Sequence, residues 1–354
     1  MKITDIKITT LPLTLHRPVV LTFGTIKKSQ SVVVKVETNT GIYGIGEAAP
    51  FGPVTGETTE TVLTVLKLLK NHLIGQDPLA LQRINHTLKG AIALNTSAKA
   101  AIDIALYDIY SKVLDVPLYV ALGGESDKVE TDITLWIAPV NEMLKEIEKY
   151  LKEGFKIFKL KAGIDSKRDI ELVKSIRENF GEELILRMDA NQGWNLTEAI
   201  DTINTLGEYK IELIEQPIPL WDIEGLKRIR EKVRVPLMAD ESLFTPEDAI
   251  RLVRENAVDL FNIKLMKSGG LFDGTRINTI GEAAGIQCMV GCMMESPISI
   301  TAAAHFVAAN KNITRCDLDS TFHSSQDRVT GGADFKGGMI TLPDTPGIGV
   351  DIDI

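Results

Sequence analysis

The stretch GFKIFKLKAG, residues 154–163, decides how the rest of the chain is interpreted, because two lysines interrupt a run with the pattern of a buried strand. Lys159 and Lys161 are two residues apart, and side chains at this spacing point to the same face of a strand. Both ammonium groups therefore point either into solvent or into one shared interior. Charge, and not hydrophobicity, is the unusual feature of this segment.

Short apolar runs of this kind recur along residues 126–325, separated by segments with a polar helical face. From the second run onward, their carboxyl ends follow one another at intervals of about 25 residues, the length of one βα unit. The repeat predicts an α/β fold, a (β/α)8-type (modified TIM) barrel. The eight runs are TDITLWIA (131–138), FKIFKLK (155–161), ELILRMDA (183–190), IELIEQP (211–217), VPLMADE (235–241), LFNIKLM (260–266), IQCMVG (286–291) and ITRCDLD (313–319).

Residues 1–125 have a different pattern, which predicts an α+β capping domain. SVVVKVETNTGIYGIGEA, residues 31–48, alternates around a turn and predicts an antiparallel hairpin, and helical periodicity follows at about 58–74 and 97–113. Gly41, Gly44 and Gly46 lie inside this hairpin instead of at a strand-to-helix turn, which argues against a nucleotide-binding loop. The Gly/Pro-rich tail, residues 326–354, is too short for a domain, and we expect it to complete the capping domain.

The composition disfavours several classes of partner. The 354 residues carry a formal net charge of −9 with no dense Lys/Arg tract, which argues against nucleic acid and anionic membranes as partners. The sequence shows no signal-peptide pattern and no run of about 18 apolar residues, so we expect a cytoplasmic protein. Cys288, Cys292 and Cys316 lack metal-site spacing and are interpreted as small buried side chains. We also expect a homo-oligomer.

Acidic residues end three successive runs of the predicted barrel. Asp189, Glu215 and Asp240 would converge at the barrel mouth, where active sites of such barrels lie and where a cation must relieve the repulsion between carboxylates. An all-oxygen ligand set suits Mg²⁺. Taken singly, each acid could equally be an ordinary loop or helix-capping residue.

Two lysines end the runs on either side of these acids. Lys161 ends the second run and Lys264 the sixth, so they would face each other across the mouth. Each alone could be a structural, ion-paired lysine. We expect Lys159, as a second cation on the same face, to lower the pKa of Lys161 so that it can act as a base.

Five motifs, in this order, resemble those of the enolase superfamily and, more narrowly, its muconate-lactonizing subgroup. They are KLK at 159–161, DAN at 189–191, EQP at 215–217, ADES at 239–242 and NIKLMKSGG at 262–270. The resemblance covers nearly the whole chain, including AAIDIALYDI and PDTPGIGV. It implies that Lys161 and Lys264 are the bases, that three acids hold Mg²⁺ to stabilise an enediolate, and that Asn191 and Glu241 support the site.

The segment RCDLDS is similar to the Asp-x-Asp of the superfamily's dipeptide epimerases, which holds the α-ammonium group of the substrate. Asp317 and Asp319 would point together into the mouth, although two acids at this spacing could also form a solvated turn. VGCMMESPISITAAAHF, residues 290–306, resembles the seventh-strand segment of these enzymes, with Met293 at the substrate and Glu295 as a polar support.

The resemblance implies a 1,1-proton transfer at the α-carbon of a dipeptide's carboxyl-terminal residue. Alternatives within the subgroup are muconate cycloisomerase and o-succinylbenzoate synthase, whose substrates have no ammonium group for Asp317 and Asp319. A Schiff-base aldolase using Lys264 and a barrel that binds without turnover belong to other classes.

Specificity is expected to depend on the first capping loop, about residues 18–28, which would cover the site together with about residues 50–58. Epimerases of L-Ala-D/L-Glu, which act in cell-wall peptide recycling, can carry an arginine there that pairs with the glutamate. Here that position is Gly24, between the apolar Phe23 and Ile26. Lys27 and Lys28 offer no bidentate fork and are expected to be solvated. A buried carboxylate without a partner is costly, so we expect a preference for neutral or hydrophobic second residues.

Overall fold

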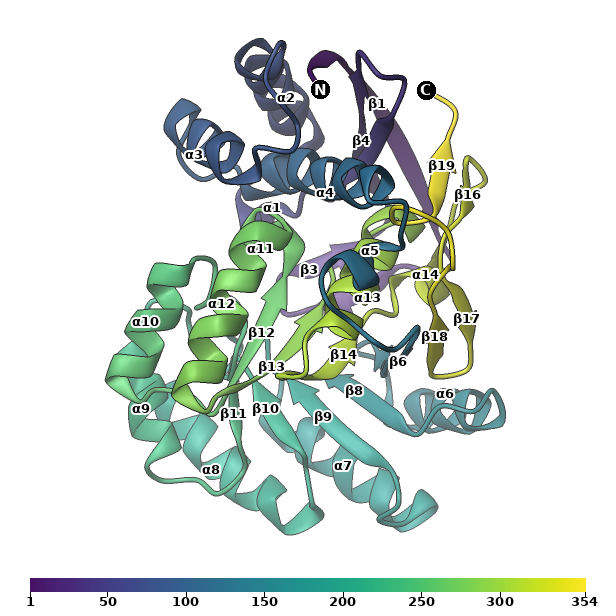
Figure 1. Cartoon of the computed structure of the whole chain (residues 1–354). Helices are drawn as coiled ribbons and strands as arrows, with labels where there is room; N and C mark the ends of the chain where they lie inside the picture. The colour runs from purple at the N-terminus through teal and green to yellow at the C-terminus, as the bar shows by residue number, and fades with distance from the viewer.

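A parallel barrel dominates the computed structural model, which describes residues 1–354 (Figure 1). Its eight strands are hydrogen-bonded in chain order, which confirms the predicted barrel and all eight strand positions. The strands are β7 (Ile133–Leu135), β8 (Ile157–Lys161), β9 (Ile185–Asp189), β10 (Leu213–Glu215), β11 (Leu237–Ala239), β12 (Leu260–Lys264), β13 (Gln287–Gly291) and β14 (Ile313–Asp317).

Helices connect successive strands on the outside of the barrel (Figure 1). Asp165, Asn195, Asp222 and Thr245 cap four of them with side-chain acceptors, which fixes where these helices begin. The connecting helices are α6 (Val140–Lys152), α7 (Ser166–Phe180), α8 (Leu196–Leu206), η1 (Gly207–Tyr209), α9 (Ile223–Arg230), α10 (Pro246–Glu255), α11 (Leu265–Ser268), α12 (Leu271–Ala284) and α13 (Pro297–Ala309).

The register of the strands places the predicted functional positions at one level. Asp189 pairs with Lys161 on one side and with Glu215 on the other, and Gly291 pairs with Lys264 and Asp317 in the same way. The barrel is nearly closed, because the N–H of Asp132 donates to the carbonyl of Cys316 at 3.3 Å across the seam between β7 and β14. The carboxyl ends of the strands therefore form one rim.

The eighth strand departs from the regular repeat. It is followed by a four-residue helix, and the tail then crosses to other sheets instead of forming a long outer helix. Ser324 and Ser325 pair with the end of β1 (Ile3–Leu15), and β18 pairs with β6 (Lys128–Glu130), which directly precedes the first barrel strand, so the tail contacts both parts of the chain. The tail elements are α14 (Ser320–His323), β15 (Ser324–Ser325), β16 (Val329–Gly331), β17 (Asp334–Lys336), β18 (Met339–Thr341) and β19 (Val350–Ile352). The domain boundary near residue 125 stays a proposal.

The amino-terminal part is an antiparallel sheet covered by helices, as predicted (Figure 1). Both predicted helices and the predicted hairpin are confirmed, whereas α3 was not predicted. Its elements are β1, β2 (Val19–Leu21), β3 (Gly24–Ile26), β4 (Ser29–Thr38), β5 (Tyr43–Ala48), α1 (Gly52–Thr55), α2 (Thr59–Leu73), α3 (Leu81–Ala91), α4 (Thr96–Val113) and α5 (Leu118–Ala121). No helix of the chain has the length and apolar character needed to span a bilayer.

Buried carboxylates join this cap to the barrel. Glu47, on β5, accepts hydrogen bonds from the backbone N–H groups of Ser296 and Ser299 at the start of α13, at 2.9 and 3.1 Å. Asp103, on α4, accepts from the N–H of Phe272 at the start of α12, at 3.1 Å. A helix amino terminus stabilises negative charge, so each contact fixes a cap element on a barrel helix.

Two glycines of the cap allow its sheet and longest helix to touch. A Cβ at Gly44 would lie 1.9 Å from the carbonyl oxygen of Ala105, and one at Gly46 would lie 1.9 Å from that of Ala101. Residues 44 and 46 share one face of β5, and Ala101 and Ala105 are one turn apart on α4. These glycines therefore serve close packing, in agreement with the argument against a nucleotide loop.

We predict that Gly46→Ala destabilises the fold by at least about 1–3 kcal/mol, because the added methyl group has no space against a backbone carbonyl. Gly90→Ala in α3 is the matched control, since nothing lies within 4 Å of its added Cβ. It should be neutral or stabilising by up to about 1 kcal/mol. Urea unfolding of both variants checks this, and equal midpoints would contradict the packing argument.

Candidate active site

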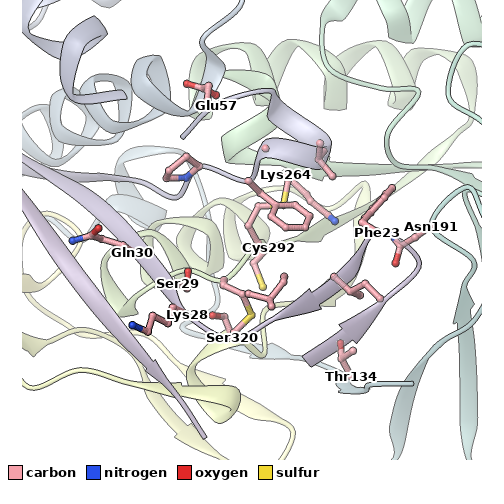
Figure 2. Close-up of a pocket in the computed structure, with 18 of the residues that line it drawn as sticks. Phe23, Lys28, Ser29, Gln30, Glu57, Thr134, Asn191, Lys264, Cys292 and Ser320 are labelled. Atoms are coloured by element: carbon pink, nitrogen blue, oxygen red, sulfur yellow. The ribbon is translucent and has the colours of Figure 1, made fainter. Parts of the chain in front are cut away.

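A cavity of about 370 Å³ lies at the rim of the barrel, between the strand ends and the cap. Figure 2 shows side chains from both parts gathered around it, with Thr134, Lys264 and Cys292 from the barrel and Phe23 and Lys28 from the cap. The two predicted capping loops both contribute to its wall. Substrate in this cavity would contact cap and barrel together.

The three predicted metal ligands are brought together at this rim. Asp189, Glu215 and Asp240 are buried, and one oxygen of each lies within 4.8 Å of the others. Burial, together with repulsion by Asp189, raises the pKa of Glu215 to about 7, and three carboxylates at this distance offer an all-oxygen donor set. The donor set therefore fits a hard divalent cation.

The two predicted bases lie on opposite sides of these acids. β8 and β12 are four strands apart in the eight-stranded order, so Lys161 and Lys264 face each other across the rim, and both line the cavity. Lys161 Nζ donates to Asp189 Oδ2 at 2.5 Å, and Lys264 Nζ donates to Asp240 Oδ2 at 2.8 Å. Burial opposes the charge of Lys264, but Asp240 outweighs it and raises the pKa of Lys264.

Lys159 lies deeper than the other two lysines and is not part of the cavity wall. Its Nζ lies 2.6 Å from Asp317, 2.8 Å from Glu215 and 3.3 Å from Asp189. Burial works against its charge, but these carboxylates prevail and hold the pKa of Lys159 well above its ordinary value. This lysine therefore stays a cation, and its effect on Lys161 as a base stays a prediction.

The three supporting residues hold the acids and the cavity wall. Asn191, at φ 41°, donates its backbone N–H to Asp189 Oδ1 at 2.9 Å and its side-chain amide to Glu241 at 3.3 Å. Burial and repulsion by Asp240 raise the pKa of Glu241 to about 8. Glu295 accepts from the N–H of Met293 at 2.7 Å and so fixes the turn that lines the cavity.

The predicted ammonium-binding pair lines the cavity, but its two members have different partners. Asp317 contacts Lys159, whereas Asp319 accepts from the backbone N–H of Thr134 at 2.5 Å and lies 3.0 Å from His323. Asp319 is buried, and the hydrogen bond from the N–H of Thr134 stabilises its ionised form. His323 was not predicted, although it follows Asp319 by four residues.

Lys267 is a second buried residue that sequence reasoning did not assign. Its Nζ lies 2.5 Å from Asp240 Oδ1 and also donates to the carbonyls of Asp240 and Asn262. Asp240 is thus paired with two lysines, which lowers its pKa well below the ordinary range against the effect of burial. The segment NIKLMKSGG contains this lysine, but the sequence did not indicate that its side chain points toward Asp240.

The cap contributes both apolar and polar side chains to the wall of the cavity. Phe23 and Ile26 line it as predicted, Met293 faces them from the barrel, and Phe23 packs edge-on against Phe51 with ring centroids 6.2 Å apart. Gly24 is exposed on the hairpin at φ 122° and lies outside the lining. Cys292, which we expected to be buried, is half-buried and lines the cavity.

A barrel with three acids between opposed lysines, closed by a separate cap, defines a class of barrel enzyme with a metal-type acidic centre. Two family models match the chain, "Mandelate racemase / muconate lactonizing enzyme, N-terminal domain" over residues 3–123 and "Enolase C-terminal domain-like" over residues 142–354. The chain belongs to the enolase superfamily, as its motifs predicted.

Curated relatives agree with this assignment. The L-Ala-D/L-Glu epimerase of Clostridium acetobutylicum is 43% identical over 99% of both chains, and the hydrophobic dipeptide epimerase of Enterococcus faecalis is 42% identical over 99% of both. A crystal structure of the dipeptide epimerase from Enterococcus faecalis V583 with Mg and L-Leu-L-Tyr has a TM-score of 0.97 and 42% identity, covering 99% of this chain and all of that one. The expectation that the chain is an isomerase is confirmed.

We predict that Mg²⁺ raises the melting temperature of the protein, because an ion that binds only the folded acids stabilises it by about 2.7 kcal/mol at 100 times its Kd. Glu215→Gln removes one ligand charge and should abolish the Mg²⁺-induced increment. Glu208→Gln, at an exposed position, is the matched control and should retain it. Thermal melts with and without Mg²⁺ measure this, and equal increments in the two variants would refute the metal site.

Proposed function

We propose that this chain epimerises dipeptides, using Mg²⁺, by 1,1-proton transfer at the α-carbon of the carboxyl-terminal residue. The observation that carries the proposal is one cavity with Lys161 and Lys264 on opposite sides of the acidic centre and with Asp317 and Asp319 in its wall. The names of the relatives support the same reaction class. A cytoplasmic location and a homo-oligomeric state stay predictions.

Different residues bind the two ends of the substrate. Asp317 and Asp319 bind the α-ammonium group, and the substrate carboxylate is directed toward Asp189, Glu215 and Asp240. Bound Mg²⁺ supplies positive charge that stabilises negative charge developing on that carboxylate. The cap excludes water from the cavity, which strengthens these electrostatic interactions.

The proton transfer uses one lysine on each face of the α-carbon. The neutral amine of one lysine takes the α-proton, and the electron pair of the C–H bond moves into the carboxylate to give an enediolate. The ammonium group of the opposite lysine then returns a proton to the other face. Atoms and charge balance, and the stereocentre is inverted.

The rival reactions leave part of this cavity without a role. Muconate cycloisomerisation and formation of a succinylbenzoate offer no cation to Asp317 and Asp319. A Schiff-base aldolase needs one reactive lysine, whereas two lysines face each other here, each paired with a different acid. The opposed pair therefore favours a reaction in which one lysine acts on each face of the α-carbon.

Substrate preference follows from the wall. Phe23, Ile26, Phe51 and Trp136 present apolar surface, and no arginine lines the cavity. Lys28, which is exposed, contributes to the outer wall and keeps its solvation there. A substrate with an acidic second residue would lose hydration without gaining a bidentate partner, so we propose a preference for neutral or hydrophobic second residues over L-Ala-L-Glu.

We predict that Lys161→Ala and Lys264→Ala each abolish epimerisation, because each removes the acid or base on one face. Each variant should still exchange the α-proton of one diastereomer with D₂O through its remaining lysine, and the two variants should select opposite diastereomers. Mass spectrometry of L,L and L,D dipeptides checks this. Normal epimerisation by both variants would rule out the two-base mechanism.

We also predict that kcat/KM for L-Ala-L-Leu or L-Ala-L-Phe exceeds that for L-Ala-L-Glu. Ile26→Arg should shift the ratio toward L-Ala-L-Glu by about tenfold or more, since a paired guanidinium removes the cost of an unpaired carboxylate. Ile26→Met, which keeps the wall apolar, is the matched control and should leave the ratio near that of the wild type. A wild-type preference for L-Ala-L-Glu would refute the specificity proposal and leave the reaction class intact.

A further inference from the structure

A buried histidine stands behind the proposed ammonium site, where no part of the mechanism above uses it. His323 is on the short helix α14 and is 6% exposed. One ring nitrogen, Nε2, lies 3.0 Å from Asp319 Oδ2, and the other, Nδ1, lies 3.2 Å from Nε1 of Trp136. The two rings meet edge to face, with centroids 5.1 Å apart.

The indole contact determines how this histidine is protonated. The Nε1–H of Trp136 is a donor only, so Nδ1 of His323 must accept, and in the neutral ring the proton is then on Nε2. Nε2–H donates to Asp319, and protonation of Nδ1 would set two donors against each other. By occupying Nδ1, Trp136 thus selects the tautomer in which Nε2 carries the proton that faces Asp319.

This arrangement leaves Asp319 ready to receive a cation. A neutral imidazole donates a hydrogen bond without cancelling the carboxylate charge, whereas an imidazolium would form an ion pair. The hydrogen bonds from His323 and from the N–H of Thr134 both go to Oδ2 of Asp319. Oδ1 is left for a ligand in the cavity that Asp319 lines.

Trp136 connects this site to the other end of the substrate. Its ring lies 5.9 Å from the Nζ of Lys161 and packs with Val19 and Leu21 of the cap hairpin. The same side chain therefore forms part of the cavity wall beside a proposed base and orients the histidine behind Asp319. A shift of the indole would disturb the ammonium site and the base together.

We propose that Trp136 and His323 are positioning residues that hold Asp319 as an ionised, oriented acceptor for the substrate's α-ammonium group. The proposal rests on the proposed dipeptide epimerisation. It separates the two acids by role, because Asp317 pairs with Lys159 while Asp319 accepts from His323 and from the N–H of Thr134. Recognition of a free amino terminus then depends on the Trp136–His323–Asp319 chain.

The kinetic test compares a dipeptide that has the ammonium group with one that lacks it. His323→Phe should raise KM for L-Ala-L-Phe by about tenfold with a smaller change in kcat, because a hydrogen bond to a charged group is lost. It should leave α-deuterium exchange of N-acetyl-L-Ala-L-Phe near the wild-type rate. His323→Gln retains an N–H donor and should restore most of the lost affinity. Equal losses with both substrates would overturn the proposal.

A matched control and a spectroscopic readout separate positioning from folding. His305 is also buried and accepts from the N–H of Tyr119 at 3.1 Å, away from the cavity, so His305→Phe should leave the ratio of the two substrates unchanged. In ¹⁵N NMR of the wild type, His323 should show the tautomer with the proton on Nε2, and Trp136→Phe should disturb it.

The proton on Nδ1 in the wild type would overturn the proposal even if His323→Phe fails to fold. If the wild type turns over no dipeptide, the proposed function fails, and the NMR result then tests the arrangement on its own.

Discussion

The ammonium group of Lys159 joins the two halves of the site, and the rest of the rim depends on it. It contacts Asp189 and Glu215 of the acidic centre and Asp317 of the proposed ammonium site, and it is almost completely buried. Acids at this density repel one another in a medium of low dielectric constant. The buried rim can therefore hold these carboxylates only if a neighbouring strand supplies cations. This explains the two lysines of GFKIFKLKAG, one of which neutralises the rim while the other faces the cavity.

The cap completes the site through contacts of the same electrostatic kind. Glu47 binds the amino terminus of α13, directly after the turn that presents Met293, and Asp103 binds that of α12. Both carboxylates are buried, and burial raises the pKa of Asp103 to about 7. These contacts fix the body of the cap on barrel helices that follow rim strands. The hairpin with Phe23 and Ile26 has its own contact with the barrel, because the hydroxyl of Thr22 donates to the carbonyl of Asn191 at 2.9 Å.

The sequence was sufficient to predict the barrel, its rim and the positions of the acids and lysines, because strand period and repeat length fix which side chains share a level. It did not assign His323, Lys267 or Trp136. Their roles depend on which neighbour they face across the rim, and that direction is set by tertiary packing. Gly24 was predicted to contact the substrate because an alignment of the hairpin placed it at the specificity position. In the structure it lies in the turn of the hairpin, at φ 122°, and outside the cavity lining.

The two relatives at 43% and 42% identity have names that differ in substrate, although both cover the whole chain. Similarity at that level therefore establishes the family and leaves the substrate preference undecided. The rim is constrained by charge balance, where one altered acid or lysine leaves an unpaired buried charge. The apolar wall has no such constraint, because one apolar side chain can replace another at small cost. Substrate preference is thus free to change while the chemistry is held fixed, and it must be read from the residues that face the cavity.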